Sequence, residues 1–156
     1  MLEKYSNTLY ESVSIDLQHQ YSNRAISWCS TLKFVEDLGD ALDDMKTSQV
    51  ISEIIFPNTL SKQCSYADTL DDSCVSNATY YVIHSHSAYF LDFIDTLKEF
   101  FQIESTDSRS KDIYLWIDIF SMNLHKPQED LNEIVLKSAT KGSLVCFDQN
   151  GEIFKR

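Results

Sequence analysis

The sequence has little glycine and proline, with three glycines and two prolines among 156 residues. Neither GxGxxG nor GxxxxGKS or GxxxxGKT occurs, so we expect no Rossmann-type dinucleotide fingerprint and no P-loop. No serine stands in a GxSxG elbow, which argues against a serine hydrolase. The sequence therefore lacks the Rossmann and P-loop motifs, and a serine hydrolase is not expected.

Long apolar stretches are also lacking. No run approaches the roughly 18 apolar residues that a membrane-spanning helix requires, and the N-terminus has no basic start followed by an apolar segment. We therefore expect a cytoplasmic protein without membrane contact. The four cysteines form no CxxC pair, and in that compartment we expect reduced, structural thiols at Cys29, Cys64, Cys74 and Cys146.

Positive charge is scarce. Thirteen Lys and Arg oppose 24 Asp and Glu, which leaves a net charge of −11. Such a surface repels phosphate backbones and anionic lipids, so we expect no nucleic-acid partner. Hydrophobic residues make up 43% of the chain and aromatic residues 12%, which is enough to form one folded core and argues against disorder.

The first part of the chain has helical spacing. Apolar residues recur every three or four positions over residues 2–17, and the same spacing predicts a second helix over about 24–45 with an acidic outer face at 36–44. A third helix is expected from Thr47, ending at Phe56 because Pro57 disfavours a helical residue before it. We predict that residues 1–60 form a helical region packed on the following domain.

The second part, residues 61–156, alternates between strand and helix patterns. Apolar, β-rich runs predict three recognisable strands at 79–84, 112–118 and 143–147. Helical spacing lies between them over 90–101 and after Pro127. This pattern predicts an α/β domain with a parallel sheet. Three strands leave open edges, so we expect either coverage by other elements or self-association through a sheet edge or helices.

Ligands in such sheets bind beyond the carboxyl ends of the strands. His84-Ser85-His86 is an HxH pattern at the first strand end, and two imidazoles two positions apart point to one side and suit zinc. Asp118 and His125, after the next strand, are candidate further ligands. In the alternative interpretation, His84 donates to backbone carbonyls and His86 faces solvent. The spacing alone assigns no metal site, and a metal-dependent hydrolase is kept as an alternative function.

Two segments carry a family resemblance. Residues 79–97 read TYYVIHSHSAYFLDFIDTL, and residues 116–125 read WIDIFSMNLH. Both resemble motifs of a group of TIR-like domains found in protists and other eukaryotes. Upstream, residues 55–59 and 64–66 resemble the segment that commonly precedes the first motif, so the similarity covers about 47–147.

The resemblance implies a flavodoxin-like sheet, self-association and a role in signalling. It also implies a site for a nucleotide such as NAD or ADP-ribose. The candidate nucleotide-binding residues are His84, Ser85, His86, Asp118, Phe120, Ser121, Asn123 and His125.

Some TIR domains cleave the nicotinamide–ribose bond of NAD with a glutamate from a stretch like RAWCLWE after the third strand. This chain reads Ile153-Phe154-Lys155-Arg156 about where that stretch would begin, and Glu152 stands too early. Ile83, His86 and Leu124 also replace the group's usual serine, tryptophan and glutamine.

We therefore expect a divergent, truncated TIR-like domain that lacks its C-terminal part. It is expected to act in protein interaction and nucleotide recognition without catalysis, so we assign no catalytic residue and no certain cofactor. The alternative is an NAD glycohydrolase whose acid is Asp118, Glu152 or a residue of a partner chain.

Overall fold

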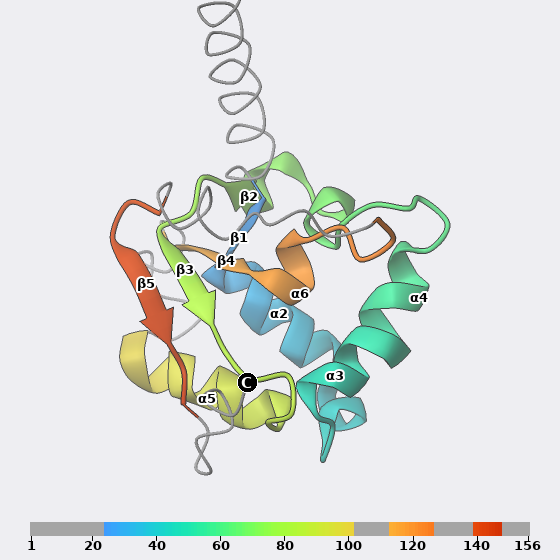
Figure 1. Ribbon diagram of the computed structural model, residues 1–156, viewed down its shortest axis with the longest axis horizontal. Helices are drawn as coiled ribbons and strands as arrows, with labels where there is room; N and C mark the ends of the chain where they lie inside the picture. The colour runs from blue at the N-terminus through green and yellow to red at the C-terminus, as the bar shows by residue number, and fades with distance from the viewer. Residues whose placement is uncertain (1–23, 102–112, 127–138, 148–156) are drawn as a thin grey trace, which may run out of the picture.

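The computed structural model describes residues 24–101, 113–126 and 139–147, which form an α/β structure around one five-stranded sheet (Figure 1). The order of strands across the sheet is β2-β1-β4-β3-β5. The strands are β1 (Ala25–Ser27), β2 (Val75–Ser76), β3 (Tyr80–Ile83), β4 (Tyr114–Ile117) and β5 (Gly142–Val145).

The three predicted strands are confirmed as β3, β4 and β5. The central strand β3 pairs in parallel with both of the others. Val82, Leu115 and Ile117 are buried, which explains why β3 and β4 read as continuous apolar runs. The prediction of a purely parallel sheet is wrong, because β1 pairs antiparallel with both β4 and β2. The sheet is mixed, and β1 covers the edge of β4 that the three-strand prediction left open.

The beginning of the predicted helix over 24–45 is wrong. Residues 25–27 form β1, and helix α2 (Trp28–Leu38) follows directly. Ser27 is extended, with φ −62° and ψ 148°, and its Oγ accepts a hydrogen bond from the Ser30 N–H at 3.0 Å. A serine in this position caps the first turn of a helix and prevents the helix from starting earlier.

The end of α2 is set by Gly39. Its φ is +48°, a value that glycine adopts without strain, and its N–H donates to the carbonyl of Val35. A short 3-10 helix, η1 (Gly39–Leu42), continues from there. Leu42 is fully buried in the core.

The third predicted helix does not end at Phe56. It consists of α3 (Thr47–Gln49), the π-helix η2 (Val50–Ile55) and α4 (Phe56–Thr59). Phe56 is helical, with φ −59° and ψ −47°, and Pro57 lies inside the helix. Proline donates no hydrogen bond to the carbonyl four residues earlier, and the wider π turns immediately before it accommodate that missing bond.

Two 3-10 turns, η3 (Ala67–Thr69) and η4 (Asp72–Cys74), lie between α4 and β2. Helix α5 (Phe90–Phe101) confirms the helical spacing over 90–101, with Phe90, Phe93, Ile94 and Leu97 buried.

The core joins the first part of the chain to the sheet. The ring of Phe34 on α2 packs edge-on against three other rings at centroid distances of 5.0 to 6.0 Å. One of them is Phe120 in α6 (Asp118–Ser121), a short helix directly after β4. The other two rings belong to Tyr66 and Phe90.

Several predicted features lie outside the described residues. They are the helix over 2–17, the helix after Pro127 and Glu152. The division into regions 1–60 and 61–156 stays a prediction. None of the helices in the described residues combines the length and the hydrophobicity that a membrane-spanning segment needs.

Candidate functional site

The carboxyl ends of β3 and β4 bring two histidines onto one carboxylate. Val82 of β3 pairs with Ile117 of β4, so the residues that follow the two strands emerge side by side. Nε2 of His84 lies 2.9 Å from Oδ1 of Asp118, and Nε2 of His86 lies 2.8 Å from Oδ2 of the same residue. We call these three residues the His84–His86–Asp118 cluster.

The members of the cluster differ in exposure. The side chain of His84 is 2% exposed, that of Asp118 31% and that of His86 44%. The His84 ring stacks on Phe93 of α5, with ring centroids 4.2 Å apart and an angle of 14° between the planes. Nδ1 of His84 is buried without a hydrogen-bond partner. His84 therefore makes its polar contact with the cluster through Nε2.

Asp118 is held in its ionised form. Burial acts to raise the pKa of Asp118, but the hydrogen bonds from His84 and His86 and their charges outweigh it, so the pKa lies well below its ordinary value. Oδ1 also accepts a hydrogen bond from the N–H of Ile119 at 2.7 Å. The cluster thus has a fixed carboxylate at its centre.

The interpretation that His84 bonds to backbone carbonyls is wrong, whereas His86 is exposed to solvent as that interpretation expected. Both imidazoles bond to Asp118 instead. The HxH spacing placed both rings on one side, as expected for residues two apart. The HxH spacing gives no indication of the third group, Asp118, which follows the neighbouring strand β4.

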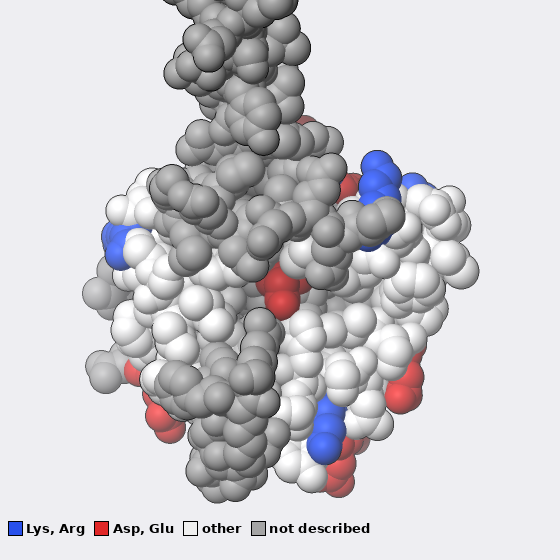
Figure 2. Space-filling view, in the orientation of Figure 1, with Lys and Arg blue, Asp and Glu red and all other residues white. Residues whose placement is uncertain are grey.

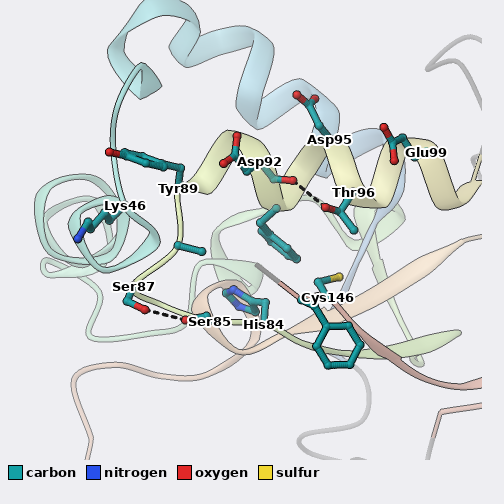
Figure 3. A pocket seen from close by; sticks show the side chains of 13 residues that line it. Lys46, His84, Ser85, Ser87, Tyr89, Asp92, Asp95, Thr96, Glu99 and Cys146 are labelled. Carbon is teal, nitrogen blue, oxygen red and sulfur yellow. Dashed lines mark hydrogen bonds between the residues drawn. The ribbon is translucent and has the colours of Figure 1, made fainter. Parts of the chain in front are cut away.

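A cavity of about 650 Å³ adjoins the cluster (Figure 3). It lies between α5 and the residues that follow β3 and β5. His84 and Ser85 line it from the end of β3, and Cys146 and Phe147 line it from the end of β5. The remaining lining residues belong to α5 and to the segments before it: Lys46, Ser87, Ala88, Tyr89, Asp92, Phe93, Asp95, Thr96 and Glu99.

The polar groups of the cavity differ along its wall. Ser85 Oγ and Ser87 Oγ are 2.8 Å apart and form a hydroxyl pair at one side. In Figure 3, Thr96 points toward Cys146, whereas Asp95 and Glu99 extend from the opposite side of α5. Lys46 is the only Lys or Arg among the described lining residues. The face in Figure 2 likewise shows no broad basic patch over its described part.

The other predicted site residues lie elsewhere. Phe120 is fully buried in the core, and Ser121 is fully buried with its Oγ unpartnered. Asn123 donates to the carbonyl of Gln63 at 2.8 Å. His125 Nε2 lies 2.8 Å from Thr59 Oγ1, and its ring centroid is 4.3 Å from that of Phe56.

Asn123 and His125 therefore fasten the segment after α6 to residues 56–63. Of the eight predicted residues, the structure brings His84, His86 and Asp118 together and places Ser85 on the cavity wall next to His84. The sequence prediction missed the other lining residues, among them Lys46, Thr96, Cys146 and Phe147. Cys146 and Phe147 follow β5 and obey the strand-end rule, whereas Lys46 reaches the site by pairing with Tyr89, which no local pattern indicates.

In comparisons with known proteins, no family model, no curated protein and no solved structure matches this chain. The resemblance to TIR-like domains thus rests on the sequence alone, and function has to be argued from the geometry of the site.

Proposed function

We propose that this chain is a TIR-like, cytoplasmic signalling module whose cavity beside β3 and β5 recognises a nucleotide of the NAD or ADP-ribose class without cleaving it. The observation that carries this proposal is the position of the cavity. It opens at the carboxyl ends of two parallel strands, β3 and β5. Open α/β sheets bind their ligands at such ends.

The order of the strands supports this position. The chain passes from β3 to β4 on one side of β3, and then to β5 on the other side. The order β4-β3-β5 is the 2-1-3 arrangement with which flavodoxin-like sheets begin. The reversal makes a crevice between the first and third of these strands, which is where such folds hold a nucleotide. The cavity lies at the ends of those two strands, β3 and β5.

The size and lining of the cavity suit a ligand of this kind. A volume of about 650 Å³ lies within the range of pockets that bind small molecules. Ser85, Ser87 and Thr96 offer hydroxyls for ribose, and Phe93 and Phe147 offer aromatic surface for a base. Lys46 offers one positive charge for phosphate.

Self-association belongs to the same proposal. Within the described residues, β5 pairs with β3 alone, and the side chains of Val145 and Phe147 are exposed. A second copy that pairs along this edge would bury both side chains. Concentration-dependent association, measured by analytical ultracentrifugation, tests this part separately.

Ligand binding is tested by calorimetry and thermal shift with ADP-ribose and NAD. We expect stabilisation of the unmodified chain by either ligand, since a ligand that binds only the folded state raises the melting temperature. Thr96→Trp places a large ring in the cavity and should abolish the shift. Thr69→Trp is the matched control, because Thr69 is exposed and does not line the cavity.

Two results would contradict the proposal. The first is the absence of any thermal shift with either ligand. The second is an equal shift in Thr96→Trp and in the unmodified chain, which would place the binding site elsewhere.

A further inference from the structure

The His84–His86–Asp118 cluster contains the residue types that bind zinc. We propose that it binds one divalent transition-metal ion, best matched by zinc, through Nε2 of His84, Nε2 of His86 and the carboxylate of Asp118. Nucleotide recognition in the cavity does not require such an ion, so this inference goes beyond the proposed function and stands independently of it.

The donor atoms are already close enough for a metal. One donor atom from each of the three residues lies within 4.8 Å of the others. Ligand bonds of about 2.0–2.1 Å in a tetrahedral zinc site place donor atoms roughly 3.3 Å apart. A small rotation of a side chain closes the difference. His86 can make that rotation, since its side chain is 44% exposed.

Two of the three ligands are fixed before a metal arrives. His84 is held by burial and by its stack on Phe93. Asp118 is held at the start of α6 by the hydrogen bond from the Ile119 N–H. Ligands held in place lose little conformational freedom on binding, and most of the metal–ligand energy then appears as affinity.

The chemistry of the donor set selects the ion. Two imidazoles and one carboxylate suit zinc and its neighbours among the transition metals, whereas Mg²⁺ and Ca²⁺ prefer oxygen ligands throughout. Three protein ligands also leave at least one position on the metal open, as in sites that bind water or a further ligand. Because His84 also lines the cavity, an ion bound to it would lie close to the cavity.

The simpler explanation of the cluster is hydrogen bonding alone. In that case each imidazole donates its Nε2–H to Asp118, and the three residues only connect the ends of β3 and β4. The two explanations differ in whether the folded chain takes up zinc.

Zinc uptake is measured on the full chain by titration calorimetry and by elemental analysis after dialysis, with zinc chloride as the probe. We expect one zinc ion per chain. His86→Ala and Asp118→Asn should each weaken binding by at least roughly 100-fold, because losing a ligand costs at least as much as losing a group that only supports a ligand. His84 is left unchanged, because replacing a buried, stacked ring also endangers the fold.

His125→Ala is the matched control, since His125 lies on the same connection but bonds to Thr59. It should bind zinc like the unmodified chain. Cobalt substitution adds a spectroscopic check, with visible absorption bands expected in the unmodified chain and lost in His86→Ala. A chain that retains no zinc, or a His86→Ala variant that binds it equally well, would overturn the proposal.

Discussion

Nε2 of His84 lies 2.9 Å from Oδ1 of Asp118, although the two residues are 34 positions apart in the chain. The contact exists because β3 and β4 run side by side in the same direction and end together. It joins a buried ring to an ionised carboxylate at the edge of a cavity. The candidate chemistry of this protein centres on that contact.

Zinc and nucleotide binding should reinforce each other. Lys46 is the only Lys or Arg among the described lining residues, while Asp92, Asp95 and Glu99 add negative charge. A divalent ion next to His84 would attract the phosphates of ADP-ribose. We expect zinc to tighten ADP-ribose binding by about tenfold, within the usual range of coupling between two sites. Calorimetry with and without zinc measures the effect.

The control for this coupling is His86→Ala, which should bind ADP-ribose with the same affinity whether or not zinc is present. If zinc tightened binding equally in that variant, the ion responsible would not be the one at the cluster.

Incubation with NAD should leave the nucleotide intact. Asp118, the candidate acid among the described residues, does not line the cavity, and both of its oxygens already accept hydrogen bonds from imidazoles. It is poorly placed to stabilise positive charge on a ribose. Chromatography should therefore show no nicotinamide above a blank without protein. Nicotinamide release that is lost in Asp118→Asn would instead establish the glycohydrolase alternative.

Trp116→Ala should destabilise the protein by about 3–5 kcal/mol, the usual cost of removing a large buried side chain. Trp116 is 1% exposed, and its ring centroid is 5.1 Å from that of Tyr81. Urea unfolding followed by circular dichroism measures the change. Leu60→Ala, at an exposed leucine, should change stability far less, and equal losses in the two variants would contradict the burial of β4.

Ser27→Ala should cost about 1 kcal/mol, because Ser27 caps α2 through its hydrogen bond with the Ser30 N–H. The sign of this change is informative. If the helix began before Ser27, as its spacing suggested, alanine would be the better helix former and would stabilise the protein. Urea unfolding of the variant distinguishes the two outcomes, with exposed Ser48→Ala as the control.

Cys146 should react slowly with iodoacetamide. Burial raises the pKa of its thiol to about 11, and only the thiolate is nucleophilic. The rate should therefore rise about tenfold for each pH unit until the pH approaches that pKa. Mass spectrometry of peptides alkylated at pH 8 and pH 9 measures the rates. Cys64, which is less buried, serves as the internal comparison. Equal alkylation rates of Cys64 and Cys146 at pH 8 would contradict the burial of the Cys146 thiol.

Part of the fold follows from local patterns. β3 and β4 are apolar almost throughout and α5 has helical spacing, so their types could be predicted from neighbouring residues alone. The two-residue alternation of His84 and His86, and the position of Asp118 at a strand end, likewise identified the candidate site.

Other elements depend on contacts between distant residues. β1 has three residues and β2 has two, too few for any periodicity, and they exist as strands because Ile26 pairs with Leu115 and Val75. The helix over 47–59 continues through Pro57 because a π turn absorbs the missing hydrogen bond, against the local preference of Phe56.

The candidate site also depends partly on local sequence and partly on contacts between distant residues. The sequence contained eight candidate residues in two short segments. Nothing in the sequence distinguished the residues that could bind a ligand from those that only support the structure. Parallel pairing of β3 with β4 joined His84 and His86 to Asp118, while hydrogen bonds to Thr59 and Gln63 drew His125 and Asn123 toward α4. Local chemistry decides which side chains can bind a ligand, and the register between strands decides which of them meet.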